Sequence, residues 1–222
     1  MILELQNIGV KFKSGDSFIN VLNDVNFSIN KGESVSLVGP SGTGKSTLLQ
    51  VSALLEKPTS GEVVVHGKRT SDLSDDERTK IRRENIGFVY QFHNLLPEFS
   101  ALENVMIPSL INNTPREIAK QKALDLLDKV DMSHRANHNS KTLSGGEQQR
   151  IAIARALAND PDIIIADEPT GNLDPTNAEI IFNLFLSLVK NNGASLFMAT
   201  HNIEFAKRLD RLVAISNGTI NN

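Results

Sequence analysis

The chain contains the stretch Gly39-Pro40-Ser41-Gly42-Thr43-Gly44-Lys45-Ser46-Thr47, from which the arrangement of the rest of the fold can be predicted. It follows the alternating run Ser34–Val38 and leads into Leu48–Val51, which predicts a strand, a tight loop and a helix in that order. Glycines in such a loop let backbone N–H groups point inward, and the helix presents its positive end to the same place. Lys45 adds a cation for terminal phosphates, and Ser46 adds a hydroxyl for Mg²⁺. The stretch therefore favours a nucleoside-triphosphate site over an ordinary glycine-rich turn.

Composition limits the class of protein. The 222 residues are 40% hydrophobic, which predicts a globular protein with a substantial core. A formal net charge of −3 argues against a protein that mainly binds nucleic acid or an anionic membrane surface. The chain has no cysteine, so disulfides and thiolate metal sites are excluded. Its first residues do not resemble a signal peptide, and no run approaches the ~18 apolar residues of a spanning helix. We therefore expect any membrane role to act through a partner.

The first thirty residues predict β-structure. Ile2–Phe12 and Phe18–Ile29 read as two strands, and an antiparallel sheet ahead of the phosphate loop is the expected result. Phe12 near the end of the first strand has two interpretations. It is a core residue, as most strand phenylalanines are, or its ring stacks on an adenine base.

The middle of the chain predicts helices. From about Ala101 to Ala158 one helical pattern follows another, and Thr114 is expected to cap one of these helices, with Pro115 in its first turn. We interpret residues 92–158, approximately, as a helical subdomain inserted into an α/β core. Residues 1–222 then form a single domain.

Four polar residues follow predicted strands. Gln91 follows one, Asp167 and Glu168 follow the wholly apolar run Ile163–Ala166, and His201 follows another. Ligands of open parallel sheets bind at the carboxyl ends of strands, so these side chains are candidates for one site. Asp167 suits the Mg²⁺ bound at the phosphate loop, and Glu168 suits the attacking water. Surface acids and a structural histidine are the simpler alternatives, and the nearby phosphate loop disfavours them.

A second glycine-rich element lies in Leu143–Arg150. Ser144 and Glu147 have the spacing of a capping box, which is a sufficient structural reason for both. It does not explain Gly145 and Gly146, because glycine in a first turn lowers helix stability relative to alanine. Glycines there let a ligand approach bare N–H groups at a positive helix end. The element therefore predicts a second surface that faces phosphate.

His134 and His138 are four residues apart, a spacing that can chelate a metal on a helix. Neither a cysteine nor an acidic zinc-enzyme motif accompanies them. We favour the interpretation of an ordinary loop.

Taken together, the motifs resemble those of ABC-transporter ATPases over nearly the whole chain. In that family's order, the Walker A, Q-loop, signature, Walker B, D-loop and H-loop motifs match Gly39–Thr47, Gln91, Leu143–Arg150, Ile163–Glu168, Gly171–Asp174 and His201. The resemblance implies an α/β P-loop NTPase fold. Its core sheet is mixed or parallel, with an antiparallel β-subdomain at the N-terminus and an inserted helical subdomain, in one nucleotide-binding domain.

The resemblance also implies roles for residues. It implies a homodimer that binds ATP and Mg²⁺, in which the signature residues Ser144, Gly145 and Gly146 of one subunit close on ATP held by the phosphate loop of the other. It makes Glu168 the catalytic base and places His201 at the γ-phosphate. Mg²⁺ is assigned to Ser46, Gln91 and Asp167, and adenine stacking to Phe12, where the family more often has Tyr. Asn202 stands where the family usually has Asp, which could weaken a salt link to a neighbouring loop.

Within the family, Tyr90–Val105 is similar to the ATPase subunits of Gram-negative lipoprotein-releasing transporters, and His134–His138 and Gly171–Asp174 match them too. That similarity implies two integral membrane subunits that dock near Gln91–Ala101, and a lipoprotein cargo that the ATPase handles indirectly. It implies a peripheral location on the cytoplasmic face of the inner membrane. A macrolide-exporter-type or cell-division-type ATPase is the alternative.

Other classes of function fit less well. A small-molecule P-loop kinase needs an acceptor pocket and has no signature helix. A soluble ABC ATPase of translation or DNA repair usually carries two cassettes or a long coiled coil. Nucleotide binding without turnover is the remaining alternative, and Glu168 argues against it.

Overall fold

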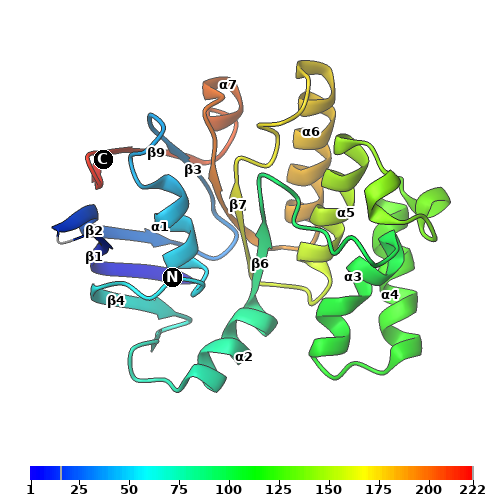
Figure 1. The fold of residues 1–222 in the computed structure, drawn as a ribbon, viewed down its shortest axis with the longest axis horizontal. Helices are drawn as coiled ribbons and strands as arrows, with labels where there is room; N and C mark the ends of the chain where they lie inside the picture. The colour runs from blue at the N-terminus through cyan, green and yellow to red at the C-terminus, as the bar shows by residue number, and fades with distance from the viewer. Residues whose placement is uncertain (16, 222) are drawn as a thin grey trace.

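The computed structural model describes residues 1–15 and 17–221, and two β-sheets form its frame (Figure 1). One sheet is antiparallel, with the strand order β2-β1-β4-β5, where the strands are β1 Leu3–Ser14, β2 Ser17–Ile29, β4 Ser60–Val65 and β5 Lys68–Arg69. The other has the order β10-β9-β3-β8-β7-β6, with β3 Ser34–Val38, β6 Ile86–Val89, β7 Ile163–Asp167, β8 Ser195–Ala199, β9 Arg211–Ser216 and β10 Thr219–Asn221. Strands β9, β3, β8, β7 and β6 are parallel, and β10 is antiparallel to β9. The predicted pair of an antiparallel and a mixed sheet is confirmed.

The helices are α1 Lys45–Ser52, α2 Asp75–Asn85, α3 Ala101–Ile111, α4 Arg116–Lys129, α5 Gly145–Leu157, α6 Pro175–Asn191 and α7 Ile203–Ala206, with 3₁₀ turns η1 Ser133–Arg135 and η2 Ser140–Thr142. Helices α3, α4 and α5 follow β6 and precede β7 in the chain, and Figure 1 shows them gathered beyond the edge of the six-stranded sheet. Over the part of the chain that the structure describes, no helix is both long enough and apolar enough to cross a bilayer.

Helix α1 is held between the two sheets. Leu48 and Leu49 on this helix are fully buried, in one apolar cluster with Leu5 of the antiparallel sheet and with Ile165 and Phe197 of the other sheet. The opposite face of the six-stranded sheet is covered by α5 and α6, and buried residues of α3, α4 and α7 belong to the same apolar cluster. Because burial of apolar surface fixes α1 against both sheets, the loop that precedes α1 has a rigid base on either side.

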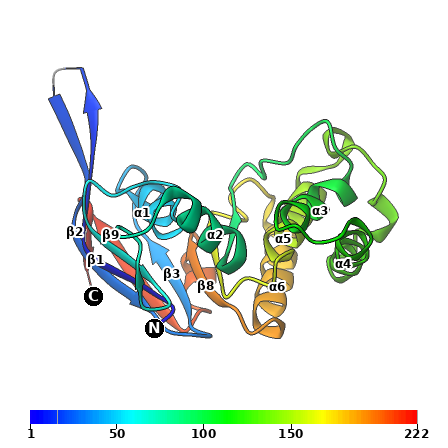
Figure 2. The same cartoon turned by 90° about the horizontal axis from the view of Figure 1, so that it is seen from below.

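The structure corrects two local predictions. Strand β1 runs two residues past Phe12, because Lys13 and Ser14 pair with Phe18 and Ser17 of β2. The paired ends of these strands form the arm that projects from the molecule in Figure 2. The expected Thr114 cap is wrong: α4 begins at Arg116, Pro115 is its N-cap residue, and no side chain caps the helix. The Thr114 N–H instead donates to Ser109 O, because it closes the end of the preceding helix.

Asn104 holds the loop between β6 and α3 in place. Its side chain is fully buried, and its Oδ1 accepts a hydrogen bond from Leu96 N at 2.8 Å. Its Nδ2 donates to Leu96 O at 3.1 Å and to Ser100 O at 3.0 Å. One amide thus bonds the Leu96 backbone, which lies outside regular secondary structure, to the start of α3.

Asn104→Ala is expected to lower the free energy of unfolding by about 2 kcal/mol, because it removes a fully buried, hydrogen-bonded side chain and leaves the Leu96 N–H without its partner. Urea denaturation measures the change. The matched control is Asn30→Ala at an exposed position, expected to change stability by less than about 0.5 kcal/mol. Equal effects of the two substitutions would contradict the role given to Asn104.

Candidate nucleotide site

The phosphate loop has the backbone that the sequence predicts. Gly42 and Gly44 have φ of 80° and 99°, and Gly44 is the N-cap residue of α1 in the left-handed region. A Cβ at Gly44 would lie 2.9 Å from Val21 O, and one at Gly39 would lie 2.5 Å from Ile215 O. Glycine is therefore required at positions 39 and 44 by neighbouring backbone, from β9 at Gly39 and from β2 at Gly44.

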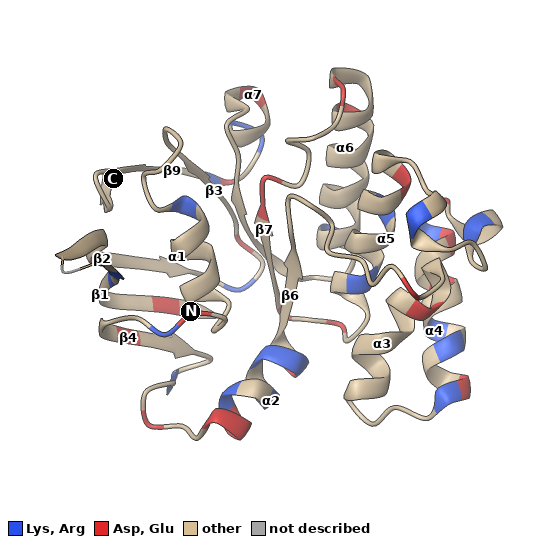
Figure 3. Ribbon diagram, in the orientation of Figure 1, with Lys and Arg blue, Asp and Glu red and all other residues tan. Residues whose placement is uncertain are grey.

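Lys45 places a cation inside this loop. Its side chain is buried, and Nζ donates to Gly39 O at 2.8 Å and to Pro40 O at 3.1 Å. The same atom lies 3.9 Å from Glu168 Oε1. Figure 3 shows the basic beginning of α1 and the acidic end of β7 at one edge of the sheet. The ammonium and the free N–H groups at the start of α1 together form a positive cradle suited to phosphate.

Ser46 and Asp167 are in contact. The Ser46 hydroxyl donates to the Asp167 carboxylate. Burial raises the pKa of Asp167 above its ordinary value, and the negative charge of Glu168 raises it further. The Ser46 hydrogen bond and the positive charge of Lys45 act in the other direction and lower the pKa, but burial has the largest effect. A hydroxyl and a half-buried carboxylate are oxygen donors of the kind that Mg²⁺ prefers, so these residues fit the cation that ATP carries.

Glu168 and His201 come together from the ends of β7 and β8. His201 Nδ1 lies 2.8 Å from Glu168 Oε2, at hydrogen-bond distance. The Glu168 side chain is 18% exposed, whereas the His201 side chain is 64% exposed. Glu168 has φ of 47°, and its N–H donates to Ala199 O at 3.0 Å. Its left-handed backbone turns the carboxylate out of the strand direction and over the phosphate loop, where Lys45 meets it.

Asn202 follows His201 and is the N-cap residue of α7. Its Oδ1 accepts hydrogen bonds from Glu204 N at 3.0 Å and Phe205 N at 3.1 Å. An asparagine amide oxygen caps a helix as well as an aspartate carboxylate does. The capping role at this position is therefore filled without a charge.

Gln91 and Glu168 converge at Gly171. A Cβ at Gly171 would lie 3.2 Å from Glu168 Oε2 and 3.4 Å from Gln91 Nε2. The carbonyl oxygen of Gln91 accepts a hydrogen bond from Asn172 Nδ2 at 3.0 Å. The strand order β3-β8-β7-β6 thus places the phosphate loop, His201, Glu168 and Gln91 at neighbouring strand ends.

Sequence reasoning missed the part played by Gly171 and Asn172, which had only the resemblance to a D-loop to single them out. It also missed Arg155, whose guanidinium contacts the backbone just after Gln91. A signal for it exists in the sequence: it is the one charged residue in the run Ile151–Leu157.

The second glycine element lies apart from the phosphate loop within one chain. Ser144 and Glu147 form the predicted capping box at the start of α5. A Cβ at Gly146 would meet nothing within 4 Å, and one at Gly145 would only touch Leu173 at 3.9 Å. A hollow of about 320 Å³ opens there, and its described lining comes from α5, the loop after β7 and the start of α6. Packing within the chain therefore gives no reason for these glycines.

The remaining residues singled out in the sequence form no hydrogen bond or ion pair with Lys45, Glu168 or His201 in the described part of the chain. Phe12 pairs with Ile19 on the arm, is 41% exposed, and so leaves part of its ring available for a ligand. His138 Nε2 lies 3.2 Å from Arg135 Nη1, and His134 lies in the adjoining 3₁₀ turn.

Comparison with known proteins agrees with this geometry. A family model described as ABC transporter matches residues 22–171. The chain is 50% identical to the lipoprotein-releasing system ATP-binding protein LolD 1 of Rhodospirillum rubrum, over 98% of this chain and 96% of that protein. It is 50% identical to LolD of Paramagnetospirillum magneticum, with the same coverage, and 48% identical to LolD of Nitrobacter hamburgensis, over 99% and 94% of the two chains.

Solved structures show the same fold. The dimeric ATP-binding cassette MJ0796, in a post-hydrolysis state bound to ADP and Pi, matches with a TM-score of 0.91 and 43% identity, over 99% of this chain and 97% of that one. The cassette CbiO1 of Clostridium perfringens, part of the transporter complex CbiONQ, matches with a TM-score of 0.86 and 28% identity, over 100% and 87%. The predicted P-loop ATPase fold is confirmed. Because the family model covers more than half of the chain, and the relatives are similar over nearly all of it, the chain belongs to the ABC transporter family.

Proposed function

We propose that this chain is the ATP-hydrolysing subunit of an ABC transporter that releases lipoproteins from the inner membrane toward the outer membrane. The observation that carries the ATPase function is the meeting of Lys45, Glu168 and His201 at one edge of the sheet. The lipoprotein role is supported by relatives at about 50% identity whose names state it. We assign residues 1–222 to a single nucleotide-binding domain, with residues 92–158, approximately, as its helical subdomain.

The site supports in-line attack of water on the γ-phosphate. Backbone N–H groups of residues 39–47 and the Lys45 ammonium bind the phosphates, and Phe12 stacks on the adenine. Ser46, Gln91 and Asp167 would hold Mg²⁺, and the ion would supply positive charge that offsets the negative charge of the phosphates. The Glu168 carboxylate takes a proton from water as the water oxygen bonds to phosphorus and the bond to the ADP oxygen breaks. The His201 ring donates to the γ-phosphate and orients Glu168.

We propose that the working unit is a homodimer. Ser144, Gly145 and Gly146 of one subunit then complete the γ-phosphate site of the other. The open space at Gly146 supports this arrangement, because these glycines serve no contact within the chain. So does the similarity to a cassette that was solved as a dimer with ADP and Pi. Two such sites related by a two-fold axis need the same surface on both subunits.

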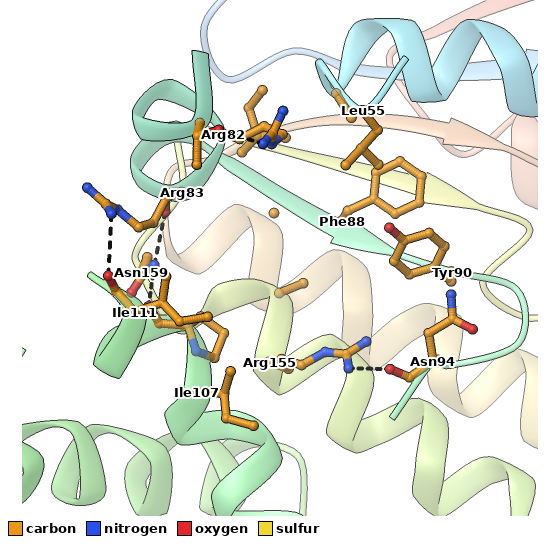
Figure 4. A pocket seen from close by; sticks show the side chains of 16 residues that line it. Leu55, Arg82, Arg83, Phe88, Tyr90, Asn94, Ile107, Ile111, Arg155 and Asn159 are labelled. Atoms are coloured by element: carbon orange, nitrogen blue, oxygen red, sulfur yellow. Dashed lines mark hydrogen bonds between the residues drawn. The ribbon is translucent and has the colours of Figure 1, made fainter. Parts of the chain in front are cut away.

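A cavity beside the Q-loop supports docking of membrane subunits near Gln91–Ala101. Its volume is about 490 Å³, and Figure 4 shows Phe88, Tyr90 and Ile111 among its largely apolar walls. Within the Gln91–Ala101 segment itself, Phe92 is 72% exposed. Exposed apolar surface next to a cavity is typical of a protein interface. We place two integral membrane subunits there, which makes the ATPase peripheral on the cytoplasmic face and its contact with lipoprotein indirect.

Glu168→Gln is expected to retain ATP binding and to lower the rate of multiple turnover by about a hundredfold or more, because the amide cannot accept the proton from water. With ATP but no hydrolysis, the variant should accumulate as a dimer. Phosphate release and gel filtration with ATP and Mg²⁺ measure the two effects. An active variant that stays monomeric would contradict the assignment of the base.

Lys45→Ala and Gly146→Asp are each expected to abolish turnover, the first by removing the phosphate cation and the second by placing a carboxylate against the γ-phosphate of the partner. Gly146 has free space, so its substitution should not unfold the chain. In a mixed dimer, the intact loop of one variant faces the intact signature of the other. Phosphate release should therefore return on mixing. Association of the two variants without any return of activity would exclude completion of the site in trans.

Affinity purification from native inner membranes should recover two lipoprotein-releasing membrane subunits with this chain. A matched chain with Phe92→Asp should recover less of them, because a charge would replace an exposed apolar contact. Recovery of cell-division or macrolide-efflux subunits instead would favour the alternative family members and leave the ATPase assignment in place.

A further inference from the structure

Arg155, near the end of α5, is held by backbone alone. Its Nη1 donates to Asn94 O and its Nη2 to His93 O, each at 2.6 Å, and Figure 4 shows the bond to Asn94. No described Asp or Glu forms an ion pair with it, and burial lowers the pKa of its guanidinium from the ordinary value. Hydrogen bonds from a charged donor are stronger than neutral ones, particularly where water is partly excluded. A partly buried cation thus donates to two consecutive carbonyl oxygens.

Those carbonyls belong to an unfavourable piece of backbone. His93 and Asn94 have φ of 57° and 49°, two left-handed residues in succession, and neither is glycine. Each such residue costs about 1 kcal/mol or more and persists only where its surroundings hold it. The Asn94 N–H donates to Phe92 O at 2.5 Å, so the turn is also tight. The planar guanidinium supplies the two separate donors that fix this turn.

The turn begins two residues after Gln91. On its upstream side Gln91 is fixed by the sheet, where Val89 is in register with Ala166 of β7. Asn172 then binds the Gln91 carbonyl oxygen, and the Gln91 amide lies close to Glu168 at Gly171. On the downstream side, Arg155 is the contact that ties the turn to α5. Helix α5, which begins at Gly145 in the signature element, is therefore hydrogen-bonded near its other end to the backbone that follows Gln91.

We propose that Arg155 is a positioning residue for Gln91, which it holds toward the nucleotide site by clamping the peptides of His93 and Asn94 to α5. The inference rests on the proposed function, because it concerns the use of Gln91 during ATP hydrolysis. It adds a mechanical link between the signature helix and the Q-loop of the same chain. Arg155 also lines the cavity beside the Q-loop, so a segment seated in that cavity contacts the clamp directly.

Arg155→Lys tests the clamp with charge retained. A lysine ammonium donates from a single nitrogen and does not reproduce the two-pronged contact. We expect kcat to fall on the order of tenfold through misplacement of Gln91, with the Kd for ATP unchanged within about twofold. Arg211→Lys is the matched control: that arginine also donates to a backbone carbonyl, Ser28 O, but lies at the start of β9, away from the Q-loop. Its kcat should equal that of the parent chain.

The decisive measurement is a double-mutant cycle with Gln91→Ala. If Arg155 acts through Gln91, adding Arg155→Lys to Gln91→Ala should change kcat by less than about twofold. A general loss of structure would instead multiply the two losses. The proposal would be overturned if the double variant showed the product of the two single losses in kcat. It would also be overturned if either single variant kept a normal kcat, or if Arg155→Lys lowered ATP affinity as much as kcat.

Hydrogen exchange separates failure of the proposal from failure of the proposed function. Arg155→Lys should speed exchange of amides in residues 92–96 and leave those of α1 unchanged. Arg155→Gln, which is neutral, should do so more strongly, and if it does not fold the Lys variant alone decides. A parent chain without ATPase activity would refute the proposed function, and the exchange result would still test the clamp. Unchanged exchange in residues 92–96 would refute the clamp in an active ATPase.

Discussion

The Lys45 ammonium lies 3.9 Å from Glu168 Oε1 and donates to two carbonyl oxygens of its own loop, at an edge of the sheet where Asp167 and Glu168 are adjacent. Two carboxylates side by side in a half-buried place repel each other, and burial already raises the pKa of Asp167. Breaking a buried charge interaction by removing one partner costs several kcal/mol, far more than loss of a surface pair. The acidic end of β7 is therefore tolerable because the cation at the start of α1 faces it.

That arrangement also prepares the loop for a ligand. Lys45 holds the loop through neutral carbonyl groups, and a phosphate offers a stronger, charged partner to the same ammonium. Helix α1 cannot shift to accommodate the exchange, since Leu48 and Leu49 are fully buried between the sheets. A phosphate would therefore meet a loop backbone that is already in place, which is the preorganisation that electrostatic catalysis requires.

The sequence was sufficient for features that depend on local chemistry. The capping box of Ser144 and the strand that ends at Asp167 follow from spacing and from apolar runs. Parallel strands have one common carboxyl edge, so their terminal residues can be grouped from the sequence alone. The sequence was insufficient where contacts join distant segments. Nothing local indicates that Asn172 binds the Gln91 carbonyl, or that Glu168 is left-handed. Thr114 shows that a local signal can also mislead. It has the residue type of a helix cap, but its N–H closes the end of α3 and Pro115 is the N-cap residue of α4.

The close approach of Ile215 O to Gly39 joins the phosphate loop to a strand that is synthesised much later than the loop. The phosphate loop is synthesised before β9, yet β9 forms one of its walls, and Gly218 lies against the Val21 backbone as well. A nascent chain that has emerged only through α6 has the loop sequence without the wall that shapes it. A nucleotide stabilises the native state only when its binding site has formed. ATP therefore contributes to the folding of this protein only after β9 has been synthesised.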